Sequence, residues 1–258
     1  MNMPSHTHLV LIPSYNTGVK LLPTVREARE RWAPVWVVID GSTDGSEVPL
    51  LQMAAEDPQL KVMVLPQNCG KGAAVLHGLV AAQAAGFTHA MTMDADGQHP
   101  AYQIPEFMAT SQAQPGAMVL GKPVFDASAP FERVAGRKLS NGAAHLETLW
   151  AGIGDSLYGM RVYPIIPLRE VMEASPWMRR FDFDPEVAVR LCWKGVVPIN
   201  IDSPVKYFKA DEGGVSHYNY VRDNLLISGM HARLLLGFIL RLPMLLWRKM
   251  GETVSNSA

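Results

Sequence analysis

The sequence predicts an α/β fold with an open, mostly parallel sheet and helices on both faces of that sheet. Short apolar segments alternate with helix-like segments along the first half of the chain, a pattern typical of sheets wound from parallel strands. Each apolar segment also runs into a polar turn, and in such sheets ligands bind at these carboxyl ends. The 258 residues, 48% of them hydrophobic, suffice for one large domain.

Five segments of the first half are expected to be strands. Residues 35–39 (VWVVI) are wholly apolar and mostly β-branched, as in a parallel strand buried on both faces. The other segments are short apolar runs that end where Gly, Asn, Asp or Ser gather. The predicted strands span residues 8–13, 35–39, 61–65, 88–93 and 117–120.

Helix-like segments separate these strands. The turn at residues 40–45 offers caps to a helix that begins at Ser46. Residues 71–85 are rich in alanine and stop before Gly86, a common helix terminator. The predicted helices span residues 19–32, 71–85 and 104–111, together with the helix from Ser46 onward.

The second half is less regular, with helices expected at residues 131–150 and 185–193. Short strands are expected at residues 160–163, 196–201 and 205–208. No repeat or linker divides the chain. We therefore expect one compact domain, residues 1–216, followed by an amphipathic helical region, residues 217–258.

The helical pattern of residues 218–249 is both apolar and basic. Its most apolar part, residues 234–247, contains Arg241 as its one charge and Pro243 as its one breaker. These 14 residues are too few to cross the ~30 Å of membrane hydrocarbon as a helix. Interspersed Arg and a terminal Trp247 suit a helix lying in an anionic bilayer interface. Packing on the domain or on a second subunit is the alternative.

Composition excludes several classes of protein. A net charge of −1 gives no reason to expect nucleic-acid binding. Cys69 and Cys192 cannot build a disulfide framework or a Cys-rich zinc site, which suits a reducing cytoplasm. Residues 1–8 are polar, and the apolar run after them is too short for a secretory signal.

The most informative motif is DADGQHP, residues 94–100, which follows the fourth predicted strand. Asp94 and Asp96 can jointly hold a hard divalent cation, which usually keeps waters and bridges to phosphate oxygens. A lone pair of this kind is commonly only a solvated turn. Here Gln98 and His99 follow, and acidic turns also end neighbouring strands, so the joint pattern predicts a metal-assisted phosphate site.

Two other turns carry polar groups toward the same edge. Asp40 closes the second strand, where a carboxylate can accept a hydrogen bond from a nucleobase or ribose; a turn or N-cap role is the alternative. Residues 68–73 (NCGKGA) place glycines and Lys71 before a helix, and such a loop can approach a phosphate or nucleoside closely. Neither P-loop spacing nor G-x-G-x-x-G is present, which argues against a dinucleotide site.

In order and spacing over residues 9–122, these turns resemble the family-2 glycosyltransferases, inverting enzymes that use nucleotide sugars. The Asp-Gly-Gln-His-Pro ending resembles the branch of dolichyl- and polyprenyl-phosphate sugar synthases. The matching stretches are residues 12–16 (IPSYN), 38–45 (VIDGSTDG), 68–72 (NCGKG) and 94–100, with weaker matches at 155–161 (DSLYGMR) and 183–186 (FDPE).

The resemblance implies a GT-A fold and assigns roles to the matching residues. A bound Mg²⁺ or Mn²⁺ would stabilise the leaving nucleoside diphosphate. The predicted metal ligands are Asp94, Asp96 and Gln98. The predicted nucleotide-sugar site comprises Pro13, Tyr15, Ile39, Asp40, Lys71, Asp94, Ala95, Lys122, Arg161 and His217, with Ile39 lining the base pocket and Lys122 reaching a phosphate.

Three positions depart from the family pattern. Ile39 stands where relatives have a first Asp, and Thr17 where an acidic residue is common. Residues 214–217 (GVSH) replace a basic G-x-S-K segment of the polyprenyl-phosphate mannose synthases. Donor and acceptor identity are therefore left open.

Asp155 is the candidate general base. A hydroxyl acceptor needs a carboxylate to take its proton, whereas a phosphate acceptor is already ionised and needs none. The alternative for Asp155 is a cap or a partner of Arg161. His217 lies where a phosphate ligand is expected, and His231 is expected to be structural.

The sequence thus predicts a glycosyltransferase bound peripherally to the cytoplasmic face of the membrane, with a homodimer as an option. It would move a hexose from a UDP- or GDP-sugar to a lipid-linked or lipid-like acceptor. One alternative is a transferase for a soluble saccharide or small hydroxyl compound. Another is a non-catalytic nucleotide-sugar-binding protein.

Overall fold

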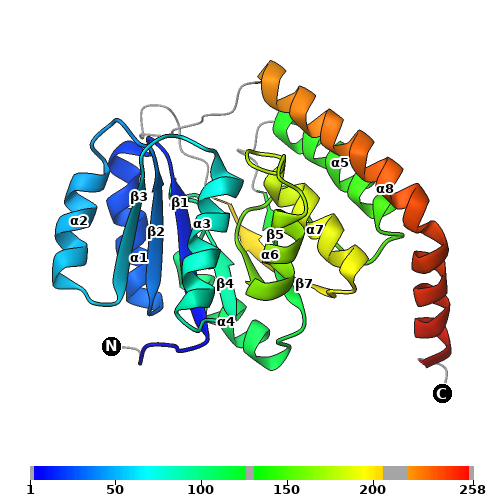
Figure 1. Cartoon of the computed structure of the whole chain (residues 1–258), viewed down its shortest axis with the longest axis horizontal. Coiled ribbons are helices and arrows are strands. Elements are labelled where there is room, and N and C mark those ends of the chain that lie inside the picture. The colour runs from blue at the N-terminus through cyan, green and yellow to red at the C-terminus, as the bar shows by residue number, and fades with distance from the viewer. Residues whose placement is uncertain (1–2, 126–130, 206–219, 256–258) are drawn as a thin grey trace.

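The computed structural model describes residues 3–125, 131–205 and 220–255. Its centre is a seven-stranded sheet in the order β3-β2-β1-β4-β6-β5-β7 (Figure 1). All pairings are parallel except those of β6 with β4 and β5. The strands are β1 His8–Ser14, β2 Val35–Asp40, β3 Leu60–Leu65, β4 His89–Thr92, β5 Met118–Val124, β6 Arg161–Pro164 and β7 Pro198–Pro204.

Eight α-helices and two short 3-10 helices accompany the sheet in the described residues. The helix α6 was not predicted, and the predicted strand at residues 205–208 lies largely outside the described residues. The helices are η1 Gly18–Lys20, α1 Leu21–Arg31, α2 Glu47–Glu56, α3 Lys71–Ala84, η2 Ala101–Gln103, α4 Ile104–Ala113, α5 Phe131–Glu147, α6 Ile165–Glu173, α7 Phe183–Lys194 and α8 Tyr220–Ser255.

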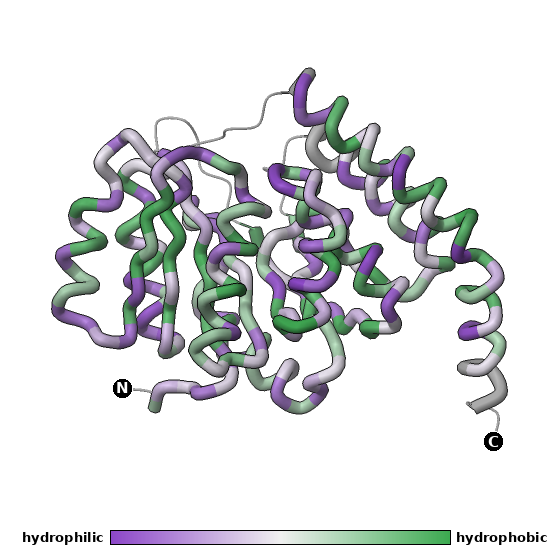
Figure 2. The backbone as a smooth tube through the Cα atoms, in the orientation of Figure 1, coloured by the Kyte–Doolittle hydropathy of each residue, from purple (hydrophilic) through white to green (hydrophobic). Residues whose placement is uncertain are grey.

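Two hydrophobic cores lie on opposite faces of the sheet, because successive strand residues point to opposite sides. Leu9 and Leu11 of β1 belong to the core with α3, α6, α7 and α8, whereas Val10 and Ile12 belong to the core with α1, α2 and α4. The central strands β1 and β2 are correspondingly buried along their whole length and mostly apolar (Figure 2). The predicted α/β fold with helices on both faces is confirmed.

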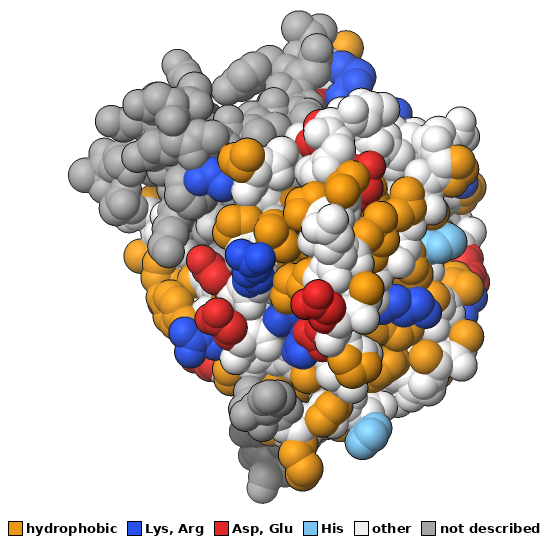
Figure 3. All heavy atoms as spheres, turned by 90° about the vertical axis from the view of Figure 1, so that its left-hand side faces the viewer, with side chains coloured by type: hydrophobic (Ala, Val, Ile, Leu, Met, Phe, Trp, Pro, Cys, Tyr) orange, Lys and Arg blue, Asp and Glu red, His pale blue; other side chains and the backbone are white. Residues whose placement is uncertain are grey.

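The strand β3 forms one edge of the sheet, the edge far from β7, and α2 lies beside it. Hydrophobic side chains on this face are interspersed with charged ones (Figure 3). Val48, Leu51 and Val64 are among its exposed apolar residues. Such isolated exposure is ordinary for a folded domain.

The C-terminal helix α8 is longer than its apolar centre predicted. It has 36 residues, about 54 Å at a rise of about 1.5 Å per residue, and it contains Pro243 without ending there. By length and composition alone, residues 222–251 are long and apolar enough to cross a membrane. Polar contacts nevertheless connect α8 to the domain along its length. Arg233 forms an ion pair with Glu186. Near the end of the helix, Arg248 donates to the Trp193 carbonyl and Lys249 donates to the Leu149 carbonyl. The boundary predicted at residue 216 lies outside the described residues.

Candidate functional site

A cleft of about 1350 Å³ lies at the carboxyl ends of β1, β2 and β4. The turn after β4, the start of α3, and the helices α5 and α8 complete its wall. The predicted site residues that line it are Pro13, Tyr15, Asp40, Lys71, Asp94, Ala95, Asp96 and Gln98. The topology therefore brings together eight predicted residues from four separate stretches of sequence.

Lys71 links two carboxylates in this cleft. Its Nζ lies 2.7 Å from Oδ1 of Asp94 and 2.6 Å from Oδ2 of Asp184. Gly159 lies against this pair: a Cβ there would come within 2.7 Å of Asp94 Oδ2 and 2.8 Å of Lys71 Nζ. The glycine is thus required by close approach of the two charged groups.

The pKa values of the two aspartates in the turn, Asp94 and Asp96, are shifted in opposite directions. Burial alone would raise the pKa of Asp94, but Lys71 and then His99 outweigh it and the pKa is lowered. Burial and the charge of Asp94 together raise the pKa of Asp96. Burial also lowers the pKa of His99 to about 4, so His99 is neutral near pH 7 and its Nδ1 accepts the Asp94 backbone N–H at 3.0 Å. A cation beside Asp96 would favour its ionised form.

The oxygen atoms that the cleft offers as metal ligands suit a divalent ion whose coordination shell also includes phosphate and water. No group of three or more His, Cys, Asp or Glu side chains within the described ranges forms a cage. Asp94 and Asp96 offer two carboxylates beside the Gln98 amide. Asp184 lines the same cleft, and its Oδ1 is buried without a hydrogen-bond partner among the described atoms. Mg²⁺ characteristically binds through one or two carboxylates plus substrate phosphates.

Asp40 is a buried support for the glycine loop. Its two carboxylate oxygens accept the backbone N–H groups of Cys69 at 2.9 Å and Gly70 at 2.7 Å. The same loop lines the cleft through Asn68, Gly70 and Lys71, and its glycines also allow close approach to a neighbouring segment of the chain. A Cβ on Gly70 would lie 2.3 Å from the Arg179 carbonyl oxygen, and one on Gly72 would lie 2.4 Å from that of Met178. The loop that was expected to approach a phosphate is therefore packed against residues 178–179.

Asp155 is 2% exposed and does not line the cleft. Its carboxylate accepts hydrogen bonds from Arg137 at 2.5 Å, from Asn141, and from the backbone of Leu157 and Tyr158. Arg161, fully buried, donates to the Asp155 carbonyl and to neighbouring backbone. Both residues hold the turn at 155–161 in shape, which is the capping alternative considered for Asp155.

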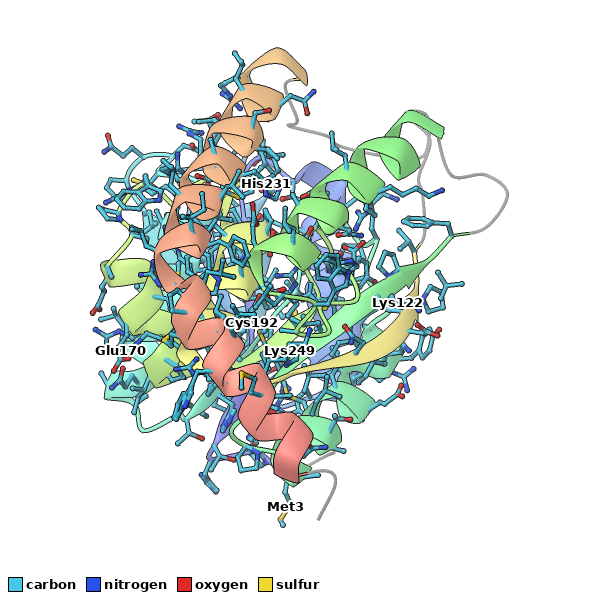
Figure 4. All side chains as sticks on the ribbon, turned by 90° about the vertical axis from the view of Figure 1, so that its right-hand side faces the viewer. Met3, Lys122, Glu170, Cys192, His231 and Lys249 are labelled. Atoms are coloured by element: carbon cyan, nitrogen blue, oxygen red, sulfur yellow. The ribbon has the colours of Figure 1, made fainter. Side chains whose placement is uncertain are left out.

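Two further predicted residues, Lys122 and Ile39, do not line the described cleft. Lys122 is half exposed on β5, with its Nζ 3.3 Å from Asp202 Oδ1 (Figure 4). Asp202 is the residue opposite Lys122 on the neighbouring strand β7, so the lysine side chain lies beside β7 instead of in the cleft. Ile39 is wholly buried in the core beneath α1 and α2, because its side chain points to that face of β2. His217 lies outside the described residues.

Several lining residues were missed as site residues. Asp184 sits in a matched stretch but had no assigned role. Arg137, Ser140 and His231 come from α5 and α8, which pattern alone treats as packing helices. A usable signal was the spacing of the uncharged polar residues 224, 228 and 231 on one face of a helix that is otherwise apolar or charged.

Comparisons with known proteins agree with this geometry. A family model described as glycosyl transferase family 2 matches residues 9–165. Polyprenol monophosphomannose synthase of Mycolicibacterium smegmatis is 28% identical over 176 residues, 66% of this chain and 64% of that protein. Undecaprenyl-phosphate mannosyltransferase of Micrococcus luteus is 31% identical over 153 residues, 58% of this chain and 57% of that protein. The matches thus span less than two thirds of either relative.

A solved structure shares the fold. Glucosyl-3-phosphoglycerate synthase of Mycobacterium tuberculosis, determined with Mn²⁺, uridine-diphosphate-glucose and phosphoglyceric acid, superimposes with a TM-score of 0.62 at 15% identity. The alignment covers 90% of this chain and 79% of that one. The GT-A architecture predicted from the sequence is therefore confirmed. Since the family model also matches more than half of the chain, this chain belongs to glycosyl transferase family 2 and resembles the polyprenyl-phosphate sugar synthases.

Proposed function

We propose that the chain is a metal-dependent, inverting hexosyltransferase. It moves the sugar of a UDP- or GDP-sugar to a lipid-linked or lipid-like acceptor at the cytoplasmic face of a membrane. The observation that carries this proposal is the pair Asp94 and Asp96 at the end of β4, in one cleft with Asp40 and Tyr15. A fold neighbour solved with Mn²⁺ and a UDP-sugar, and relatives named for polyprenyl-phosphate chemistry, support it.

The chain's own residues prepare the donor site. Asp40 fixes the loop at residues 68–70 and so the wall beside which the nucleoside binds. Lys71 keeps Asp94 ionised and orients it. Asp94, Asp96 and the Gln98 amide would hold Mg²⁺ or Mn²⁺. When bound, the metal supplies positive charge for the diphosphate as it leaves.

The helix α8 supports the proposed acceptor class. Between Asp223 and Glu252 this helix contains no acidic residue, while Arg233, Arg241, Arg248 and Lys249 lie within that span. Its outward side chains include Leu236, Ile239, Leu240, Trp247 and Met250, all exposed. Basic and apolar groups together favour an anionic bilayer surface. Because the start of α8 also lines the cleft, a membrane-bound α8 places the donor site beside lipids.

The experiment that tests the donor site is a thermal-shift screen of the full chain. UDP, GDP, CDP and dTDP are each added with and without Mn²⁺, to the wild type and to Asp96→Ala. A ligand at about 100 times its Kd stabilises by about 2.7 kcal/mol. We expect one nucleotide to raise the melting temperature only with metal, and not in Asp96→Ala. If no nucleotide shifts the wild type, the donor-site assignment is wrong.

A further inference from the structure

The first turns of α8 carry a polar stripe on the side that faces the cleft. Asn224, Ser228 and His231 are four and three residues apart, so they share one helix face, and all three line the cleft. The outward side presents exposed Leu225 and Leu240 instead. Further along the helix the inward side is apolar, with Met230 and Leu234 fully buried in the core, so these polar side chains are confined to the part of α8 that borders the cleft. The stripe therefore belongs to the chemistry of the cleft.

His231 is oriented by a buried carboxylate on α5. Its Nδ1 lies 2.9 Å from Oε1 of Glu147, which is 2% exposed. The other oxygen of Glu147 has no hydrogen-bond partner among the described atoms. The hydrogen bond to His231 is therefore the side-chain interaction that the Glu147 carboxylate makes in the described structure. A carboxylate acceptor at Nδ1 holds the ring proton there and leaves Nε2 as the basic nitrogen. Figure 4 shows His231 on the side of α8 that faces α5.

Ser140 connects that nitrogen to the cleft wall. Its Oγ lies 3.0 Å from His231 Nε2 and 3.2 Å from Ser156 Oγ. Ser156 donates its own hydroxyl proton to Asn141 Oδ1 at 2.7 Å, which leaves the Ser156 oxygen free to accept. The Ser140 proton can therefore point to His231 while the ring is neutral and turn to Ser156 once Nε2 is protonated.

The charged groups of the cleft are less suited to a phosphate nucleophile. The candidate base Asp155 already accepts four hydrogen bonds, one of them from Arg137. Of the four Lys and Arg side chains among the described lining residues, three contact a carboxylate: Lys71, Arg137 and Arg222. A dianionic acceptor gains most from cations that are not yet neutralised. A neutral hydroxyl needs a proton acceptor, and the cleft offers one.

We propose that His231 is the catalytic base and that the acceptor attacks with a hydroxyl group carried by a lipid-like molecule; this rests on the proposed function. The acceptor oxygen forms a bond to C1 of the donor sugar. The bond from C1 to the β-phosphate oxygen breaks, and its electron pair leaves with the nucleoside diphosphate. The hydroxyl proton passes through Ser140 to His231 Nε2, where Glu147 balances the imidazolium charge.

The test compares two acceptors of equal chain length, decyl glucoside and decyl phosphate, with UDP-glucose or GDP-mannose as donor and Mn²⁺ present. We expect transfer to decyl glucoside, with His231→Gln lowering kcat by about 10²- to 10⁴-fold and leaving the KM for the donor unchanged. Glu147→Gln is expected to lower kcat as well, because an amide N–H facing Nδ1 favours the wrong ring tautomer. His145→Gln is the matched control. The ring of this α5 histidine hydrogen-bonds to the Ile153 carbonyl and does not line the cleft, so the kcat of this variant should equal that of the wild type.

Each other outcome is decisive. Transfer to decyl phosphate alone, or to neither acceptor, overturns the proposal. Unchanged kcat in His231→Gln with a lowered melting temperature assigns the pair to helix packing and also overturns it. These results leave the donor site intact as long as nucleotide and metal still raise the melting temperature. Loss of that stabilisation in the wild type instead contradicts the proposed function.

Discussion

At the scale of single residues, Gly159 is the clearest example of a position set by its neighbours. The Asp94 carboxylate and the Lys71 ammonium occupy the space that a Cβ would fill. Gly70, by contrast, accommodates the backbone carbonyl of Arg179. Gly159 therefore permits the ion pair between Lys71 and Asp94 at the acidic turn of residues 94–100.

Gly159→Ala should separate or rotate Lys71 and Asp94. We expect the nucleotide- and Mn²⁺-dependent rise in melting temperature to fall by at least half, while circular dichroism stays unchanged. Gly116→Ala is the control, because no atom lies within 4 Å of a Cβ there. Equal nucleotide responses of the two variants would show that the close approach at Gly159 has no role in binding.

His8 should make stability depend on pH. Burial, with a smaller contribution from the stacked ring of His89, lowers its pKa from 6.5 to about 4. The folded state therefore disfavours the charged form, and the unfolded chain binds more protons between pH 6.5 and 4. Stability is fully present above the unfolded value and falls as the pH drops through this window, by up to about 3 kcal/mol.

The measurement is the free energy of unfolding by urea at pH 7, 6, 5 and 4. His8→Gln should show a shallower decline over this range, whatever its stability at pH 7. His6→Gln, a change at an exposed position two residues away, should keep the wild-type slope. A parallel decline in all three proteins would assign the pH dependence to other groups.

At the scale of elements, α8 is the most consequential. Its inner side packs on α5 and α7, and its outer side is apolar and basic. We expect changes on the inner side to affect the stability of the fold and changes on the outer side to affect membrane attachment.

The outer side is expected to bind lipid. In a sedimentation assay, wild-type protein should bind liposomes containing anionic lipid, and rising salt should weaken binding because it screens the Arg and Lys charges. Leu236→Glu combined with Leu240→Glu should reduce binding at least tenfold without lowering the melting temperature. Val19→Glu, equally exposed on η1's surface, should bind as the wild type does. Absence of wild-type binding would favour a soluble acceptor.

At the scale of the whole molecule, α8 is expected to unfold together with the sheet. Leu234 is fully buried in the core that joins α3, α6, α7 and α8. Leu234→Ala should cost about 2–5 kcal/mol in a single transition, as large-to-small core changes do. Leu236→Ala, two residues further on and 66% exposed, should cost less than about 0.5 kcal/mol. A separate low-temperature transition lost in Leu234→Ala would mean that α8 folds independently.

The strand–turn–helix order of the first half and the eight predicted residues that line the cleft follow from the sequence. Apolar period and turn composition are local properties, so β1, β2 and β4 and the acidic turn at residues 94–100 could be located without knowing their neighbours. Parallel strands then place their carboxyl ends together, which is why Asp40, Asp94 and Asp96 meet in one cleft. The family resemblance rested on the same local stretches.

Tertiary structure alone decided what each polar group contacts. Asp155 looked available as a base until Arg137, Asn141 and two backbone N–H groups were found around it. His231 looked structural until α8 was placed against Glu147 and Ser140, residues 84 and 91 positions away. Contacts of this separation depend on helix packing, and no local pattern encodes them. The sequence by itself determined the sheet and the polar turns at the carboxyl ends of β1, β2 and β4. The packing of α5 and α8 decided the opposite wall of the cleft, because the contacts of Ser140, Glu147 and His231 join residues far apart in the sequence.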